Sequence, residues 1–174
     1  IKLLGDLKKE GTTLKLVHLE KELTSTIEVN GLTINLKGKA DRIDQIGNTI
    51  RIIDYKTGNV EASQALKIKD WEALKDEKFN KGFQLLMYAY LWSKTENTNK
   101  FELHSGIYSL RSLSKGLMLV SVDGAYNLNE EILQQFEDEV KVLLQEMLDK
   151  KKVFSQTSNH KICDNCAFKS ICNR

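Results

Sequence analysis

Two charged side chains directly follow an apolar run in the segment Ile-Arg-Ile-Ile-Asp-Tyr-Lys-Thr-Gly, residues 50–58. Because the side chains of a β-strand alternate between its two faces, Asp54 and Lys56 are expected on the face that Ile50 and Ile52 bury. Charges on a buried face are costly unless they are paired or hold a metal ion. Taken alone, the segment is compatible with an exposed Asp–Lys pair at a strand end or with a functional site.

A second carboxylate is expected beside Asp54. The segment Gly-Lys-Ala-Asp-Arg-Ile-Asp, residues 38–44, is separated from the first segment by a Gly-Asn turn, so the two strands should be antiparallel neighbours that bring Asp41 near Asp54. Adjacent carboxylates repel each other unless they share a hard divalent cation such as Mg²⁺, which would lower the pKa of a bound water and neutralise a phosphate. With Lys56 to orient or activate that water, these side chains suffice for phosphodiester hydrolysis.

Turn signals and hydrophobic periodicity predict the elements that position these residues. Asn30-Gly31 is a strong hairpin signal, and three consecutive strands should form an antiparallel meander. Gly38, within the second strand, permits a bulge or a close backbone approach. The strands are predicted over 14–29, 32–44, 49–56, 101–110 and 117–122, and the helices over 81–93 and 129–150, with a shorter helix around Trp71 and Leu74.

The helix over 81–93 is apolar almost all round between Phe83 and Trp92, so it should be deeply buried. Gln84 and Tyr88 are four residues apart and therefore share one face of this helix. A glutamine in so apolar a helix needs a hydrogen-bonding partner, whereas Tyr88 could equally be an ordinary core aromatic.

Length and composition describe a single globular domain. The chain has 174 residues, 41% hydrophobic and 29% charged, with a formal net charge of +2, which neither demands nor excludes a nucleic-acid partner. It contains no stretch long enough to span a membrane and no signal peptide. We expect one domain over 1–174, a cytoplasmic location, and, because the chain begins at Ile1 without a methionine, an N-terminally truncated fragment of a longer protein.

The two acidic segments together are similar to the PD-(D/E)XK nuclease superfamily. Gly-x-x-Asp-Arg-Ile-Asp followed by Ile-x-Asp-Tyr-Lys-Thr-Gly resembles the RecB-type nuclease domains, and more closely the AddB-like subunit of bacterial helicase–nucleases, over residues 14–172. The resemblance implies a restriction-endonuclease-like core of the α/β class (α+β type), in which helices flank a mixed central sheet. It also implies that Asp41 and Asp54 bind Mg²⁺ or Mn²⁺ and that Lys56 is catalytic.

Two further features of that family bear on this chain. Its Gln-x-x-x-Tyr helix corresponds to Gln84 and Tyr88, which would steady the site or the scissile strand. The family also has a helix before the first strand that adds a histidine or glutamate to the metal, and no such helix is visible before Leu14. His18 lies inside the first strand, where a sheet or surface histidine is the favoured interpretation.

Other acidic and basic residues have weaker claims on the site. Asp44 should face away from Asp41 and form a salt bridge with Arg42 or a nearby lysine, and Glu20 is either a third carboxylate of the site or an ordinary surface glutamate. Cationic side chains between the third strand and the buried helix could track a DNA backbone or form a solvated face. They are Lys67, Lys69, Lys75, Lys78 and Lys81, with Arg111 and Lys115 as weaker candidates in a later loop.

A cysteine-rich tail spans residues 160–174. Cys163, Cys166 and Cys172 form a C-x₂-C-x₅-C pattern, whose closely spaced thiolates can bind one metal. AddB-like nucleases and the four-cysteine nucleases of CRISPR systems end similarly, and there an upstream cysteine completes a [4Fe–4S] cluster. Here the fourth ligand was lost with an N-terminal portion, or His160 completes a zinc site, or the tail binds nothing.

The expected function is that of a metal-dependent DNA exonuclease domain within a recombination-repair helicase–nuclease. The resemblance implies single- or double-stranded DNA ends and a helicase subunit or domain as partners. The chain lacks the Gly-x-x-x-x-Gly-Lys-[Ser/Thr] motif of a helicase, so any translocation must come from another part of the parent protein or from a partner subunit. One alternative is a catalytically silent DNA-binding or scaffold module of the same fold. Another is a CRISPR-associated-type iron–sulfur nuclease, which Asp-Tyr-Lys in place of Glu-x-Lys disfavours.

Overall fold

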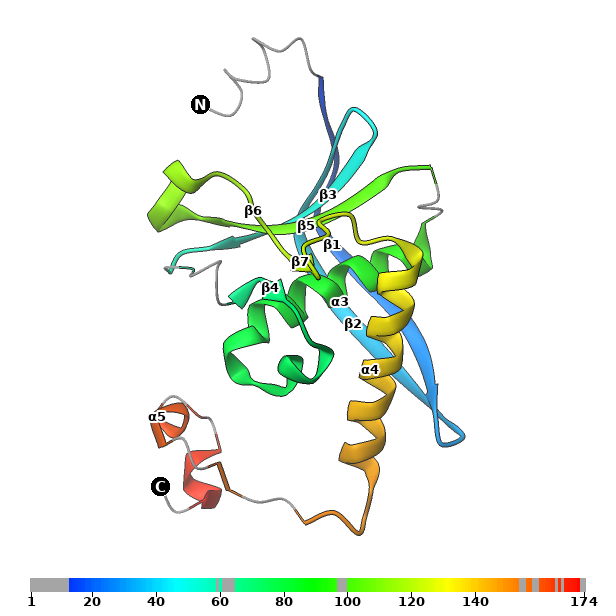
Figure 1. Ribbon diagram of the computed structural model, residues 1–174, viewed down its shortest axis with the longest axis vertical. Helices are drawn as coiled ribbons and strands as arrows, with labels where there is room; N and C mark the ends of the chain where they lie inside the picture. The colour runs from blue at the N-terminus through cyan, green and yellow to red at the C-terminus, as the bar shows by residue number, and fades with distance from the viewer. Residues whose placement is uncertain are drawn as a thin grey trace.

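A five-stranded mixed sheet forms the centre of the computed structural model (Figure 1). The structure describes residues 13–58, 60, 65–96, 100–153, 156–157, 160–164, 166 and 168–172. The strands of this sheet, in spatial order, are β1 (Leu14–Val29), β2 (Leu32–Ile46), β3 (Thr49–Lys56), β5 (Glu102–Ser109) and β6 (Met118–Leu119). Neighbouring strands are antiparallel except β3 and β5, which are parallel. The α+β architecture and the antiparallel meander are therefore as predicted.

Tight turns set the register of the meander. Asn30 and Gly31 both have positive φ angles, as a type I′ hairpin turn requires, and Val29 pairs with Leu32 across it. Gly47 also has a positive φ angle in the turn between β2 and β3. With the turns fixed, hydrophobic burial selects which face of each strand meets the helices.

The face that β2 buries changes along the strand. Ala40 and Ile43 both belong to the hydrophobic core although they are three residues apart, so the alternation of side chains shifts between them. On the neighbouring strand, Glu20 has a φ angle of 49° at the same level, between the pairs Leu19–Arg42 and Lys21–Ala40. Asp41 therefore lies where the long hairpin changes the face that it turns to the core.

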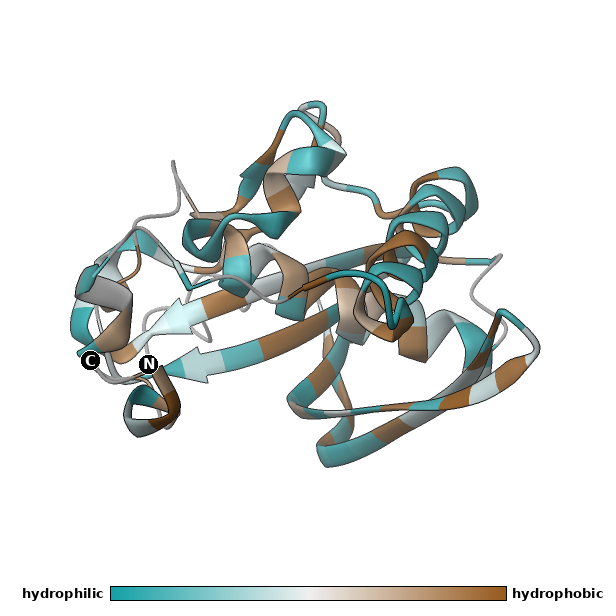
Figure 2. Cartoon of the chain, turned by 90° about the horizontal axis from the view of Figure 1, so that it is seen from below, coloured by the Kyte–Doolittle hydropathy of each residue, from teal (hydrophilic) through white to brown (hydrophobic). Residues whose placement is uncertain are grey.

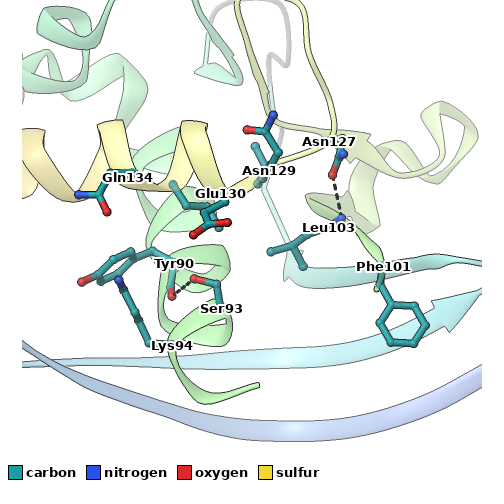
Figure 3. A pocket seen from close by; sticks show the side chains of 11 residues that line it. Tyr90, Ser93, Lys94, Phe101, Leu103, Asn127, Asn129, Glu130 and Gln134 are labelled. Atoms are coloured by element: carbon teal, nitrogen blue, oxygen red, sulfur yellow. Dashed lines mark hydrogen bonds between the residues drawn. The ribbon is translucent and has the colours of Figure 1, made fainter. Parts of the chain in front are cut away.

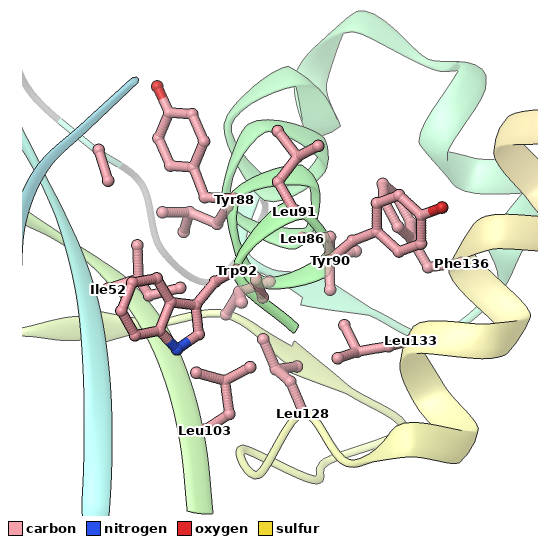
Figure 4. Packing of buried hydrophobic residues seen from close by; sticks show 14 of the residues in the cluster. Ile52, Leu86, Tyr88, Tyr90, Leu91, Trp92, Leu103, Leu128, Leu133 and Phe136 are labelled. Atoms are coloured by element: carbon pink, nitrogen blue, oxygen red, sulfur yellow. The ribbon is translucent and has the colours of Figure 1, made fainter. Parts of the chain in front are cut away.

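Two long helices cover one face of the sheet. Helix α3 (Asn80–Thr95) lies against β1, β2, β3 and β5, and α4 (Glu130–Leu148) packs on α3 and β1. Half of the α3 residues are buried, which agrees with its apolar sequence. On α4 the Asn129 side chain caps the N-terminus, and Phe136 meets the ring of Tyr90 at the contact between the helices (Figure 4).

Short elements depart from the predicted pattern. The expected strand over 117–122 is divided between β6, which pairs with β5, and β7 (Ser121–Val122), which pairs with β4 (Lys67–Ile68) in a separate two-stranded sheet. Strand β4 was not predicted. The turn-like elements are the 3₁₀ helices η1 (Trp71–Lys75), η2 (Glu77–Phe79), η3 (Leu110–Lys115) and η4 (Lys169–Cys172), with α5 (His160–Cys163) in the tail.

No helix in the described part of the chain combines the length and the hydropathy that a membrane span needs.

Candidate active site

The acidic end of β3 is buried. Ile50 and Ile52 are in the core, and Asp54, two residues further on the same face, is 4% exposed. Lys56 Nζ lies 2.9 Å from Asp54 Oδ2, but this ion pair lacks hydrogen-bond geometry. No other donor of the described residues reaches that buried oxygen, so Asp54 keeps an acceptor available for a further cation.

Asp41 lies beside Asp54 on the neighbouring strand. The register pairs Arg42 with Ile53, which places Asp41 and Asp54 opposite each other at the next position. Asp41 Oδ2 accepts a hydrogen bond of 2.7 Å from the backbone N–H of Tyr55, which fixes this carboxylate against the end of β3. The structure thus brings the two predicted carboxylates together.

The electrostatic environment disfavours a charged Asp54. Burial raises the pKa of Asp54, the ion pair with Lys56 lowers it, and the negative charge of Asp41 raises it further. The net shift is upward, so one ammonium group does not fully compensate the buried carboxylate. A divalent cation between the two carboxylates would reverse this balance.

Helix α3 supplies two polar side chains to the same site. Gln84 Oε1 accepts a hydrogen bond of 3.1 Å from Lys56 Nζ, and Gln84 Nε2 donates one of 2.6 Å to the Tyr88 hydroxyl. Asp54, Lys56, Gln84 and Tyr88 therefore form one continuous chain of contacts. Burial raises the pKa of Tyr88 above its usual value, so the hydroxyl stays protonated at neutral pH. The partner that the sequence demanded for Gln84 is Lys56.

Gly38 makes room for Tyr88. A Cβ atom on Gly38 would lie 3.0 Å from two carbons of the Tyr88 ring and 3.1 Å from Leu91. The pairing with Leu23 continues through Gly38, so this position is a close approach rather than a bulge. The register shift of the hairpin lies elsewhere, between Leu16 and His18.

Asp44 is part of a separate ionic cluster on the other face of the sheet. It is fully buried and pairs with Arg42, as predicted, and also with Arg51, whose Nε lies 2.7 Å from Asp44 Oδ1. Arg51 was not predicted as a partner, although strand alternation and the pairing of Asp44 with Arg51 could have indicated it. The two arginines neutralise the buried Asp44 on the face of the sheet opposite the candidate site. The cluster contributes no ligand to that site.

Glu20 and His18 do not join the two carboxylates. Glu20 is exposed and forms an ion pair of 2.6 Å with Lys39. His18 packs edge-on against Trp92, with 5.7 Å between ring centroids. The interpretation of Glu20 as a surface residue and of His18 as a sheet histidine fits these contacts.

A divalent cation fits the donors of this site. Asp41 and Asp54 offer hard carboxylate oxygens, and Asp54 Oδ2 is buried without a hydrogen bond. Among the residues that the structure describes, no group of three or more His, Cys, Asp or Glu side chains gathers here or elsewhere. Two protein carboxylates with remaining positions for water and phosphate oxygens are a usual arrangement for Mg²⁺.

The predicted DNA-binding lysines differ in their exposure and in their ion pairs. Lys67 and Lys69 are exposed and Lys81 is half-buried. Lys75 and Lys78 each pair with an acidic residue of their own segment, at 3.2 and 3.0 Å. These pairs reduce the positive charge that the segment offers to a phosphate backbone, which leaves Lys67, Lys69 and Lys81.

The cysteines of the tail are not gathered into a metal site. Cys163 and Cys172 are half-buried and Cys166 is exposed, and all three are free thiols. Together with His160, they form no cluster of ligands within the described residues. Within the described residues the tail therefore shows no assembled metal site, and metal binding by these cysteines stays a prediction.

One pocket of the molecule lies away from the five predicted catalytic residues. It has a volume of about 430 Å³ and lies between the end of α3, the start of β5 and the first turns of α4, with Tyr90, Lys94 and Gln134 in its wall (Figure 3). None of the five predicted catalytic residues lines it. The candidate site lies instead at the end of β3, where Asp54 is buried and Lys56 is partly exposed.

Comparison with known proteins identifies the family. The model of the PD-(D/E)XK nuclease superfamily matches residues 1–173. No curated protein matches the chain. A similar solved structure, the crystal structure of SSO0001, is 19% identical with a TM-score of 0.42, and the match covers 98% of this chain and 65% of that one. The chain thus spans just under two thirds of that structure's length. The match over residues 1–173 establishes that the chain belongs to the PD-(D/E)XK nuclease superfamily.

Proposed function

We propose that the chain is a Mg²⁺- or Mn²⁺-dependent DNA exonuclease domain of the RecB/AddB type, working within a recombination-repair helicase–nuclease. The observation that carries the proposal is the contact chain from Asp54 through Lys56 and Gln84 to Tyr88, with Asp41 beside it. Superfamily membership supports nuclease chemistry. The sequence motifs support the exonuclease activity and the helicase partner.

Each side chain has a distinct task in this proposal. Asp41 and Asp54 would hold the cation, which supplies an activated water and neutralises charge on the phosphate. Lys56, held between Asp54 and Gln84, is placed to orient the attacking water and to offset negative charge that develops on the phosphate. Gln84 fixes the ammonium group, and the Tyr88 hydroxyl fixes Gln84.

The nuclease assay compares wild type with Asp54→Asn and Lys56→Met on end-labelled single- and double-stranded DNA, with Mg²⁺, Mn²⁺ or EDTA. Wild type should cleave only with metal, and each variant should lose at least about 100-fold in rate. Asp138→Asn, an exposed carboxylate on α4, is the matched control and should cleave like wild type. Cleavage in EDTA, or cleavage that survives Asp54→Asn, would exclude this site.

A catalytically silent DNA-binding module is the second candidate. The observation that favours it is that just two carboxylates gather at the site within the described residues. Folded wild-type protein that binds DNA in the same assay but never cleaves it, with either metal, would support this alternative.

We also propose that residues 1–174 form one domain of a longer protein and that its tail binds a metal there. The spacing of Cys163, Cys166 and Cys172 supports a [4Fe–4S] cluster with a fourth ligand outside this chain, and His160 supports zinc instead. No catalytic step depends on this tail.

A further inference from the structure

Tyr55 occupies the reverse face of the strand that carries the candidate site. It lies between Asp54 and Lys56 in β3, so its side chain projects from the opposite face. Tyr55 is 38% exposed, whereas the two residues that precede it in β3, Ile53 and Asp54, are buried. Such exposure is unusual for an aromatic residue in a central strand. The Tyr55 ring therefore presents apolar surface to solvent at the end of the strand.

The ring is held firmly in place. It stacks on Tyr108 of β5, with 6.1 Å between ring centroids and 19° between ring planes. Arg42 Nη1 donates a hydrogen bond of 3.2 Å to the Tyr55 hydroxyl, and Asp44 in turn holds Arg42. A ring fixed on one side and exposed on another loses little entropy when a flat ligand stacks on it.

Tyr55 is also tied directly to the candidate metal ligands. Its backbone N–H donates to Asp41 Oδ2 at 2.7 Å, and its Cα is one residue, about 3.8 Å, from that of Asp54. The two carboxylates and the ring project from opposite faces of β3 near its end, so a nucleic-acid strand bound at the carboxylates meets the ring where it continues around this end of the sheet.

The surface around Tyr55 has the composition of a nucleic-acid contact. Helix η3 begins beside the end of β3, because Lys56 pairs with Ser109 in the parallel register. In η3, Leu110 and Leu113 are 51% and 61% exposed, and Arg111 lies between them. Figure 1 shows η3 at the tip of β5, and in Figure 2 the ends of β3 and β5 turn from brown to white and teal. Aromatic, apolar and cationic groups thus meet at one end of the sheet.

We propose that the Tyr55 ring is a stacking subsite for one unpaired base of the DNA strand that occupies the candidate active site. Base–aromatic stacking is tolerant of sequence because every base has a flat π-face. A base inside a duplex is already stacked on its neighbours, so the subsite selects frayed or single-stranded ends. This inference rests on the proposed function, because the strand must lie at Asp41 and Asp54.

Binding without cleavage tests the subsite separately from catalysis. In EDTA, a labelled single-stranded oligonucleotide should bind Tyr55→Leu at least about fivefold more weakly than wild type, whereas Tyr55→Phe should retain wild-type affinity. An oligonucleotide that carries 2-aminopurine, a fluorescent adenine analogue quenched by stacking, should be quenched by wild type and by Tyr55→Phe but not by Tyr55→Leu. Blunt duplex DNA should show little difference among the three proteins.

Tyr126→Leu is the matched control, because Tyr126 is 48% exposed in the turn before α4, and it should bind like wild type. Melting curves verify that each variant is folded. Equal binding and equal quenching by wild type and Tyr55→Leu would overturn the subsite, and so would an equal loss on blunt duplex or the absence of binding by wild type. Cleavage that still requires Asp54 would then leave the proposed function standing. If wild type quenches 2-aminopurine but does not cleave DNA with either metal, the proposed nuclease activity is overturned and the stacking subsite is not.

Discussion

Gly38 has no side chain, and the ring of Tyr88 fills the space beside its Cα. The glycine therefore allows α3 to approach β2 closely enough for the Tyr88 hydroxyl to reach Gln84, and through it Lys56. The absence of a side chain at Gly38 thus determines where Tyr88 of the candidate site can lie.

Gly38→Ala should lower both stability and nuclease rate. The added Cβ, 3.0 Å from the ring, must displace Tyr88 or the helix, and overpacking of this kind costs about 1–3 kcal/mol. Urea unfolding measures the loss, and initial rates well below the melting temperature measure the effect on catalysis. Gly58→Ala is the control for stability, since a Cβ there meets nothing within 4 Å. Unchanged unfolding and rate in Gly38→Ala would show that Tyr88 is not held as described.

The convergence of Asp41, Asp54 and Lys56 could be predicted because it depends on local rules. Strand alternation and one short turn place all three together. The pairing of Lys56 with Gln84 joins residues that are 28 apart, and the sequence indicated only that Gln84 needs a partner. The stacking of Tyr55 on Tyr108 could not be predicted, because it depends on the parallel register of β3 with a strand some fifty residues later.

At the scale of the elements, Glu137 of α4 joins the two long helices. Its carboxylate lies 2.8 Å from Lys94 Nζ of α3 and 2.7 Å from Lys141 Nζ of its own helix. Burial alone would raise the pKa of Glu137, but the hydrogen bonds and charges of the two lysines outweigh burial and lower it to about 2. The ion pair of Glu137 with Lys94 thus joins α3 to α4, as does the aromatic contact of Tyr90 with Phe136.

The ion pairs of Glu137 should make the free energy of unfolding depend on pH in the acidic range. Because the pKa of Glu137 is lower in the folded chain than in the unfolded chain, its contribution is complete above pH 4.5, the ordinary pKa, and is lost as the pH falls toward 2. Thermal unfolding between pH 2 and pH 5 should show a shallower acid dependence in Glu137→Gln than in wild type. Glu131→Gln, exposed on the same helix, should keep the wild-type slope. Identical slopes in wild type and Glu137→Gln would contradict this role of the ion pairs.

The long elements could be predicted and the short ones could not. Helices α3 and α4 and strands β1 to β3 carry strong periodicity or clear turns, and their observed bounds differ little from those predicted. Strands β4 and β7 are two residues each, too short for any alternation to be recognised. Their pairing is decided by the packing of the segments around them and not by their own sequence.

At the scale of the whole molecule, the cysteine-containing tail contributes little to the core. Phe168 and Ile171 are 67% and 78% exposed, so these two apolar side chains of the tail lie in water. The hydrophobic core consists of residues from β1 through α4. Stability of the sheet and occupancy of a metal in the tail should therefore be independent.

Cys166→Ser tests this separation. Urea unfolding of the core should change by less than about 0.5 kcal/mol, the range of surface substitutions. A metal in the longer parent protein would appear as broad visible absorbance for an iron–sulfur cluster or as stoichiometric zinc, and either signal should disappear in Cys166→Ser. A large loss of core stability would show that the tail is part of the folded body. If the wild-type parent protein shows neither the visible absorbance nor the zinc, the proposal that the tail binds a metal is wrong.

The parallel pairing of β3 with β5 also sets when the site can appear during synthesis. All five candidate catalytic residues precede residue 89, yet β3 lacks its second neighbour until the chain has passed Ser109. Contacts between segments so far apart in sequence form late, because closing a long loop costs entropy before the contact repays it. A nascent chain that has emerged only as far as α3 thus carries every residue of the site without the sheet that holds them. Under the proposed function, activity should therefore arise only after β5 is in place, when the domain is nearly complete.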